Sequence, residues 1–306
     1  MISRTIDVAG VVLRFHGDRS AADLLDSRYG AFAISAPTGR VDAEIELELR
    51  APRARAPAVP AARDSVPATR HAVPATRHAV PAAPHDDGFA VTERDGRAVF
   101  EGGGLRAEVD ADAARARIRA PRAERAVDAV VRYVLASHLL ARGGLLVHAS
   151  AVRIGDRAWV FAGPSGCGKT TIGTRLAGEL LCDEAVAVMP GDAGPVAWAT
   201  PYWHARPGRA RIAGLVFPER PGRATDAPEW RAVSAGQALA RLMREIGPLL
   251  PSAAPRILRA AAPLVSATSC ARVTMPTIEN IHDWLQPRLA ATPPVPEPKP
   301  VGAVAT

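Results

Sequence analysis

The sequence of 306 residues has no long apolar run and only three cysteines. No stretch approaches the roughly 18 consecutive apolar residues of a membrane-spanning helix, so no membrane partner is expected. Residues 1–7 lack the apolar core of a signal peptide, so we expect a cytoplasmic protein. The cysteines Cys167, Cys182 and Cys270 form neither a disulfide framework nor a CxxC metal site, which favours reduced thiols.

Lysine is almost absent, because the 38 basic residues are all arginines except Lys169 and Lys299. Their excess over 31 acidic residues gives a net charge of +7, which can indicate a nucleic-acid partner. The arginines are scattered among alanines, however, and no basic run is interleaved with aromatic residues, so no nucleic acid is expected. Such an arginine bias reflects genome composition, and it makes Lys169, the only lysine outside the C-terminal segment, informative.

Residues 51–87 consist mainly of alanine, proline, arginine and histidine, and a seven-residue unit recurs in them, as in 66–72 and 73–79. A proline in every unit excludes a continuous helix or a central strand, so the segment is predicted to be a disordered, polyproline-like insertion. Its regularly spaced histidines fit a solvated loop better than a metal site. The stretch from residue 287 onward has the same character, and residues 291–306 are predicted to be a disordered tail.

Residues 1–120 are predicted to be a β-rich N-terminal region that carries this insertion. Residues 6–15 and 41–49 alternate apolar and polar side chains as half-buried strands do, and short strands with turn signals continue to about residue 118. Apolar residues at helical spacing over 127–139 then open a second part, 121–290. The expected fold class is α/β, with a mixed sheet and flanking helices that follow a smaller β-rich region.

The motif that carries chemistry follows the apolar strand 158–162. Residues 163–171 match the P-loop pattern G-x-x-x-x-G-K-[ST] at every fixed position, and a helix over 172–180 is predicted after them. Glycines let the backbone wrap around phosphates, Lys169 balances their charge, and Thr170 supplies a hydroxyl to Mg²⁺. The predicted nucleotide-binding residues are Gly163, Pro164, Ser165, Gly166, Cys167, Gly168, Lys169, Thr170 and Thr171. A chance glycine turn would not explain why the informative lysine falls at this position.

Asp183 and Glu184 form an acidic pair that begins fourteen residues after Lys169. This length suffices for the predicted helix and one turn, so both carboxylates are expected near the loop that binds Mg²⁺. A carboxylate there can hold the metal or accept a proton from an attacking hydroxyl. The alternative is an acidic turn between a helix and a strand. An ABC transporter ATPase is excluded, because no apolar strand ending in Asp-Glu follows the stretch 233–237, which is similar to the LSGGQ signature of that class. Residues 234–243 are instead predicted to be an amphipathic helix with Ser234 as its N-cap.

Residues 145–152, the P-loop and residues 181–188 together resemble the C-terminal kinase domain of HPr kinase/phosphorylase. They resemble equally its relatives in peptide-maturation gene cassettes of the lasso-peptide and SynChlorMet types. The resemblance covers about residues 121–290 and implies transfer of a phosphoryl group from ATP to a serine hydroxyl. The acceptor implied is a peptide or small protein, co-encoded in such cassettes, and an oligomer is compatible with this assignment.

By the same resemblance, His148 and Asp183 are the catalytic residues, and Thr170, Asp183 and Glu184 hold Mg²⁺. Two departures stand out: Glu184 replaces the second aspartate of the family, and a downstream glycine-rich segment has no counterpart. His148 also fits a buried, hydrogen-bonded core histidine. Two alternatives to a kinase stay open, namely a nucleotide-binding or nucleotide-hydrolysing accessory protein of a biosynthetic cassette, and a binding module whose acidic pair has lost its function.

Overall fold

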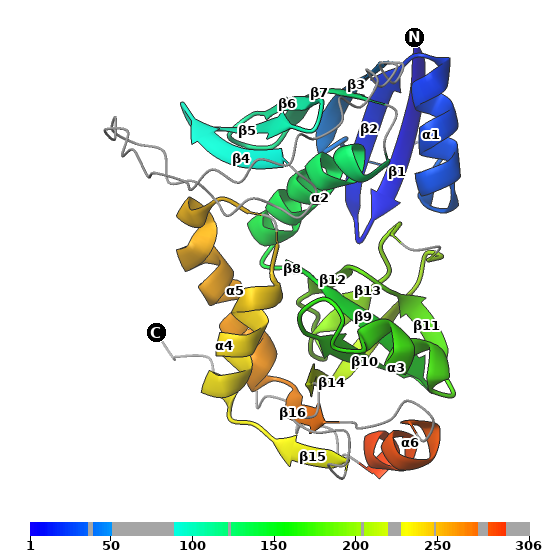
Figure 1. The fold of residues 1–306 in the computed structure, drawn as a ribbon, viewed down its shortest axis with the longest axis vertical. Helices are drawn as coiled ribbons and strands as arrows, with labels where there is room; N and C mark the ends of the chain where they lie inside the picture. Colours follow the sequence, from blue (N-terminus) through cyan, green and yellow to red (C-terminus); the bar gives the residue numbers. More distant parts are fainter. Residues whose placement is uncertain are drawn as a thin grey trace, which may run out of the picture.

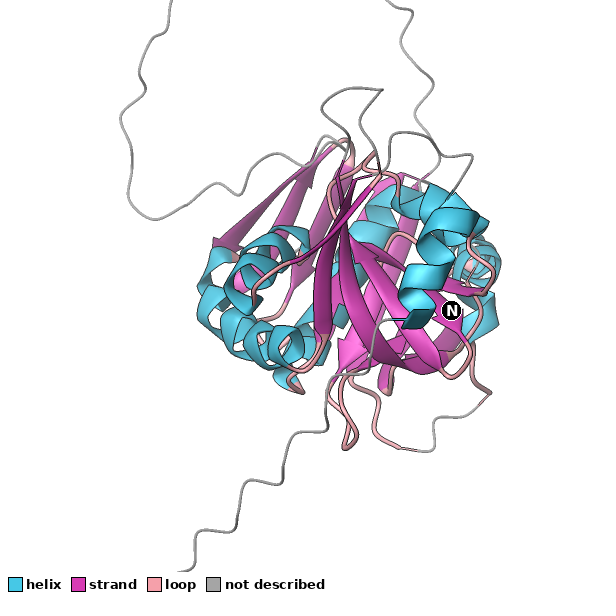
Figure 2. Cartoon of the chain, turned by 90° about the horizontal axis from the view of Figure 1, so that it is seen from below, coloured by secondary structure: helices cyan, strands magenta, loops and turns pink. Residues whose placement is uncertain are grey.

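A computed structural model describes residues 1–35, 39–50, 89–121, 124–202, 205–219, 228–247, 249–274 and 281–291. The predicted insertion at 51–87 and residues 292–306 of the predicted tail lie outside these ranges. The described chain is a mixed α/β structure with two sheets and flanking helices, which confirms the expected fold class at that level (Figures 1 and 2). Within these ranges, no helix has the length and apolar character needed to cross a membrane.

The first sheet has seven strands in the order β1-β2-β3-β7-β6-β5-β4. β3 pairs in parallel with both β2 and β7, and the other pairs are antiparallel. One face is apolar and packs against α1 and α2, whereas the other carries arginine and glutamate side chains in cross-strand pairs. The elements of this part are β1 (Ile2–Val8), β2 (Val11–Gly17), α1 (Arg19–Tyr29), η1 (Gly30–Phe32), β3 (Ala43–Arg50), β4 (Phe89–Arg94), β5 (Arg97–Gly102), β6 (Leu105–Val109), β7 (Arg115–Pro121) and α2 (Glu124–Ala141).

Two features of this region differ from the sequence-based expectation. The alternation over 6–15 spans two strands, because the chain reverses at Ala9 and Gly10, which both have positive φ. Asp7 Oδ1 accepts a hydrogen bond of 2.8 Å from the Gly10 amide and thereby stabilises the turn. The second difference is helix α1, which the strand pattern does not predict and which Asp18 caps through its side chain.

The second sheet has nine strands in the order β11-β9-β10-β14-β13-β12-β8, and β16 joins β14 to β15. The long strand β14 is central. It pairs in parallel with β10 on one side, and on the other it pairs antiparallel with β13 and then in parallel with β16. Its elements are β8 (Leu145–Val147), β9 (Ala149–Ile154), β10 (Arg157–Ala162), α3 (Lys169–Arg175), β11 (Glu179–Cys182), β12 (Val186–Met189), β13 (Val196–Trp198), β14 (Arg209–Glu219), β15 (Glu229–Ala232), α4 (Ala235–Glu245), η2 (Pro251–Ala253), α5 (Ala254–Ser266), β16 (Ser269–Thr274) and α6 (Ile281–Ala291).

Three predictions from the sequence concern the start of α4, the C-terminal segment and the boundary at residue 120. Ser234 caps α4 in a capping box with Gln237, which confirms the predicted helix start. Helix α6 continues through Pro287 to Ala291, so the disordered character expected from residue 287 is wrong up to that point. One hydrophobic core runs through both sheets. The predicted boundary at residue 120 between a β-rich part and a P-loop part stays a prediction.

Helix α2 lies between the two sheets and contacts β6 and β7 above it and β8 below it (Figure 1). A buried polar contact attaches it to α1. Asp128, which is 6% exposed, accepts hydrogen bonds from Arg28 Nη2 at 2.6 Å and from the Tyr29 hydroxyl at 2.5 Å. Burial, reinforced by the Asp128 charge, raises the pKa of Tyr29 well above its usual value, so the hydroxyl keeps its proton and donates.

Removal of Asp128 should therefore destabilise the whole chain. We expect Asp128→Ala to lower the free energy of unfolding by about 3 kcal/mol, because it leaves Arg28 and Tyr29 without their buried acceptor. Urea denaturation measures the change. The matched control is Asp26→Ala, which removes the partner of Arg4 at the surface and should change the unfolding free energy little. Equal effects of the two substitutions would contradict the structural role of Asp128.

Candidate functional site

The P-loop connects β10 to α3, and its glycines meet specific backbone requirements. Gly166 and Gly168 have φ values of 75° and 103°, in the left-handed region that favours glycine. A Cβ atom on Gly163 would lie 2.9 Å from Cys167 Sγ, which is closer than side chains normally approach. The loop therefore favours glycine at 166 and 168 through its backbone, and a side chain at 163 would displace the Cys167 thiol.

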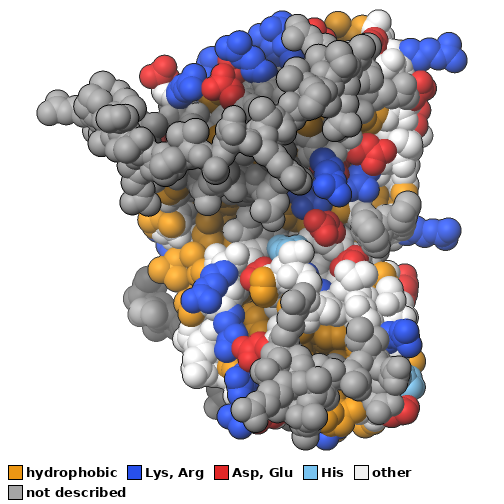
Figure 3. Space-filling view, viewed as in Figure 1, with side chains coloured by type: hydrophobic (Ala, Val, Ile, Leu, Met, Phe, Trp, Pro, Cys, Tyr) orange, Lys and Arg blue, Asp and Glu red, His pale blue; other side chains and the backbone are white. Residues whose placement is uncertain are grey.

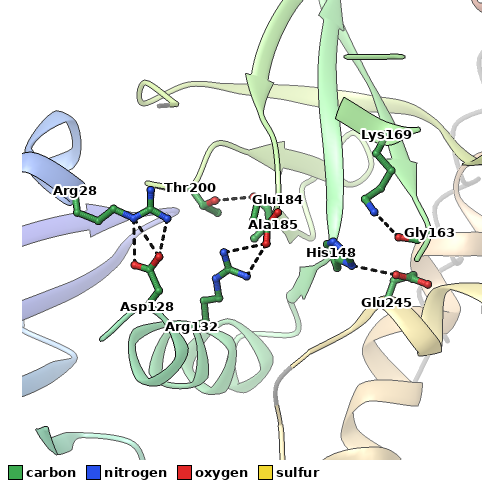
Figure 4. A network of polar contacts seen from close by, with 10 residues as sticks. All are labelled: Arg28, Asp128, Arg132, His148, Gly163, Lys169, Glu184, Ala185, Thr200 and Glu245. Atoms are coloured by element: carbon green, nitrogen blue, oxygen red, sulfur yellow. Dashed lines mark hydrogen bonds and ion pairs between the residues drawn. The ribbon is translucent and has the colours of Figure 1, made fainter. Parts of the chain in front are cut away.

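Lys169 turns its ammonium group into this loop. The residue is 6% exposed, and Nζ donates a hydrogen bond of 2.6 Å to the Gly163 carbonyl (Figure 4). It donates a second hydrogen bond, of 3.0 Å, to the Pro164 carbonyl. A cation held against loop carbonyls can exchange these acceptors for phosphate oxygens. The structure thus places the Lys169 ammonium inside the loop.

The chain after the P-loop differs from the prediction. The predicted helix over 172–180 ends at Arg175, and β11 follows, so this prediction is wrong in its second half. The reason is packing against β9. A Cβ atom on Gly178 would lie 2.6 Å from the Arg153 carbonyl, and the residues that follow it pair antiparallel with β9. The glycine permits a close approach that no other residue allows.

Asp183 directly follows strand β11 and lies beside the P-loop residue Thr170. Asp183 is 3% exposed, and its two carboxylate oxygens accept hydrogen bonds from different hydroxyls. The Thr170 hydroxyl donates to Oδ2 at 2.6 Å, and the Ser150 hydroxyl donates to Oδ1. The structure therefore brings the predicted Thr170 and Asp183 together. Sequence reasoning missed Ser150, whose one signal is a hydroxyl between the apolar residues Ala149 and Ala151.

Glu184 follows Asp183 directly but points elsewhere. Its backbone is left-handed, with φ of 76°, and its Oε1 atom lies 3.3 Å from Nη1 of Arg132 on α2. The Arg132 guanidinium in turn lies 4.3 Å above the centre of the buried Tyr202 ring. The structure thus pairs Glu184 with a cation of α2, and no hydrogen bond links its carboxylate to Thr170 among the described residues. Its predicted part in metal binding stays a prediction.

Thr170 and Asp183 suit magnesium better than a metal that takes all of its ligands from protein side chains. Across the ranges that the structure describes, no group of three or more His, Cys, Asp and Glu side chains is arranged to hold a metal ion. Mg²⁺ usually takes one or two carboxylates, and completes its shell with substrate phosphates and water. The hydroxyl of Thr170 and the carboxylate of Asp183 fit this pattern.

His148 lies between β8 and β9 and faces the end of α4. Its Nδ1 atom is 3.3 Å from Oε2 of Glu245, and its backbone amide donates a hydrogen bond of 2.7 Å to the Glu245 carbonyl (Figure 4). The His148 side chain is 34% exposed, which does not fit the alternative of a buried core histidine. Glu245 was not predicted, because nothing in its local sequence distinguishes it from other helix-terminal glutamates.

The three cysteines are free thiols. Burial raises the pKa of each above its usual value, and for Cys182 it does so to about 12. A thiol that keeps its proton is a poor nucleophile. The structure therefore supports packing roles for these residues.

No family model and no curated protein matches the chain. Among solved structures, the Hpr(Ser) kinase/phosphatase from Coxiella burnetii is similar over 47% of this chain and 93% of that chain. The sequence identity is 9% and the TM-score is 0.28. A likeness of this size carries no argument, so a function must be argued from the residues of this chain.

Cys182 offers a direct test of the packing beneath Asp183. With a pKa of about 12, only about one in 10⁴ of its thiols is ionised at pH 8, so alkylation of the native protein should leave it unmodified. Iodoacetamide labelling followed by peptide mass spectrometry measures this. The same reaction in denaturant should label all three cysteines, and rapid labelling of Cys182 in the native protein would contradict its burial.

Proposed function

We propose that this chain is a magnesium-dependent phosphotransferase that passes the γ-phosphoryl group of ATP to a hydroxyl of a peptide or small protein. The observation that carries the proposal is the contact between the Thr170 hydroxyl and the Asp183 carboxylate, immediately beside the loop that holds Lys169. A phosphate-binding loop without a carboxylate at its threonine would support nucleotide binding alone.

The residues of the loop would hold the triphosphate of ATP. Its amides and the Lys169 ammonium provide donors and positive charge, and Thr170 with Asp183 would hold Mg²⁺. Mg²⁺ held by these two residues would supply positive charge against the charge that develops on the phosphoryl oxygens. Ser150 supports this arrangement, because its hydrogen bond fixes the second oxygen of Asp183 and leaves the carboxylate little freedom to turn.

One observation favours the alternative of a nucleotide-binding accessory protein without kinase activity. Glu184 is paired with Arg132, and both oxygens of Asp183 accept hydroxyl hydrogen bonds. Asp183 is therefore placed better to hold a metal than to receive a proton from a substrate. A kinase of this type needs another proton acceptor, and the alternative does not.

The acceptor rests on the sequence resemblance rather than on geometry. A peptide or small protein encoded nearby, with an accessible serine, is the substrate class that we propose. Light scattering of the purified protein, with and without MgATP, tests whether copies of the chain associate.

The first test concerns nucleotide binding. Lys169→Ala should abolish the binding of MgATP in isothermal titration, because the triphosphate would lose its only lysine partner in the described chain. Arg175→Ala, at the exposed end of the same helix, is the matched control and should leave the affinity unchanged. Equal affinity in wild type and Lys169→Ala would refute the P-loop assignment.

The second test concerns transfer. Asp183→Asn preserves size but removes the charge that would hold Mg²⁺, so label transfer from γ-labelled ATP to a co-encoded acceptor should fall by about 10²-fold or more. ATP binding, measured in parallel, should persist. Glu184→Gln is the control at the neighbouring position and should cost less. Undiminished transfer in Asp183→Asn would exclude this mechanism, and no transfer by the wild type would favour the accessory protein.

A further inference from the structure

A cavity of about 540 Å³ lies between the end of α2, the turn that joins β12 to β13, and α5 (Figure 1). Among the described residues that line it, none belongs to the P-loop and none to the acidic pair. Its volume lies within the range of small-molecule sites. The proposed function gives this cavity no role, so it is a candidate for a second binding site.

The turn over residues 190–195 gives the cavity a wall of fixed shape. The Gly194 amide donates a hydrogen bond of 3.0 Å to the Gly191 carbonyl, and Gly194 has a φ of 113°. A Cβ atom on Gly191 would lie 2.8 Å from the Gly194 carbonyl oxygen. Gly143, which follows α2 and also lines the cavity, has a φ of 76°. These backbone conformations favour glycine, so the wall is formed before any ligand arrives.

Helix α5 contributes one stripe of its surface to the cavity. The lining positions follow one another at intervals of three and one, as residues on one side of a helix do. They are Arg256, Arg259, Ala260, Pro263, Leu264 and Ala267. Both arginines come first along the helix, and the four residues after them are apolar. Since the stripe extends for about 16 Å along the helix axis, the cavity has a charged end and an apolar end on this side.

The charged residues that line the cavity favour a ligand with one negative charge. Arg256 and Arg259 are exposed, and neither forms an ion pair with any residue that the structure describes. Asp192, in the turn, is also exposed and is equally without an ion pair in that part of the chain. Two guanidinium groups and one carboxylate leave an excess of one positive charge. A guanidinium binds a carboxylate through two parallel hydrogen bonds, so a monocarboxylate is the matching head group.

The rest of the wall is apolar. Leu140, Val188, Pro190, Pro195 and Leu264 contribute side chains that neither donate nor accept hydrogen bonds. A peptide main chain against these side chains would leave its amides without partners, which costs free energy. A hydrocarbon chain has no such groups, and its transfer from water to this wall is favourable. The wall therefore favours an alkyl or aryl group over a peptide segment.

We propose that this cavity binds an apolar monocarboxylic acid. The carboxylate pairs with Arg256 and Arg259, and the hydrocarbon part lies between α5 and the turn over residues 190–195. This site is separate from the P-loop, and its binding needs neither nucleotide nor phosphoryl transfer. The proposal therefore does not rest on the proposed function.

Isothermal titration of the full chain without nucleotide tests the proposal with three probes that share a ten-carbon chain, namely decanoate, decanol and decylamine. Decanoate should bind saturably, with one molecule per chain. Decanol and decylamine should bind about fivefold more weakly or less, because neither offers a negative charge to the guanidinium groups. Added salt should weaken the binding of decanoate and leave that of decanol unchanged, since salt screens exposed charges.

Substitutions at the cavity should act in opposite directions. The double variant Arg256→Gln/Arg259→Gln should lower the affinity for decanoate about fivefold, whereas Asp192→Asn should raise it. Ala141→Phe places a ring at an exposed position that lines the cavity, and it should lower the affinity tenfold or more. The matched control is Arg244→Gln, at an exposed arginine of α4 that does not line the cavity, and it should leave the affinity unchanged.

The same titrations give the results that would overturn the proposal. They are no saturable binding of decanoate by the wild type, equal affinities for decanoate and decylamine, or an unchanged affinity in the double arginine variant. Unchanged binding in a folded Ala141→Phe would locate decanoate elsewhere and equally overturn the site. Lys169→Ala should bind decanoate as the wild type does, so failure of the P-loop assignment and failure of this proposal are distinguishable.

Discussion

The carboxylate of Asp183 is the interaction on which the rest of the site depends. A buried carboxylate needs hydrogen-bond partners, and Asp183 receives one from α3 through Thr170 and one from β9 through Ser150. These bonds join the helix that follows the P-loop to the strand that flanks it. They also fix the distance between the P-loop and the Asp183 carboxylate. Without that carboxylate, Thr170 and Ser150 would be two unrelated hydroxyls on neighbouring elements.

The predictable part of the site is the part that lies close together in the sequence. The P-loop motif fixes β10, the loop and Lys169 within a dozen residues, and Asp183 follows at a length that the chain can span. Ser150 and Glu245 come from positions set by strand register and by the end of α4, 33 and 97 residues away from their partners Asp183 and His148. No local pattern encodes such contacts, because pairing across the sheet determines them.

The errors in secondary structure have the same origin. Ile172, Leu176 and Leu180 follow a helical period, but pairing with β9 takes the chain into β11 before the third of them. Tertiary context overrides propensity there. Helix α1 is a different case, because its apolar residues and the Asp18 cap are local helix signals. The course of the chain into β11 is set by pairing with a distant strand, whereas α1 is encoded locally.

Helix α2 connects the first sheet to the candidate functional site. Asp128 and Arg132 are four residues apart and so lie on one side of the helix, where Asp128 holds α1 and Arg132 holds Glu184 (Figure 4). In Figure 3, charged side chains of both signs gather at the level where the two parts meet. A left-handed backbone at a residue other than glycine costs about 1–3 kcal/mol, which the surrounding structure must offset. At Glu184 the contact with Arg132 contributes to this. The first sheet thus positions α2, α2 restrains Glu184, and Asp183 is left as the only carboxylate of the acidic pair that reaches the P-loop.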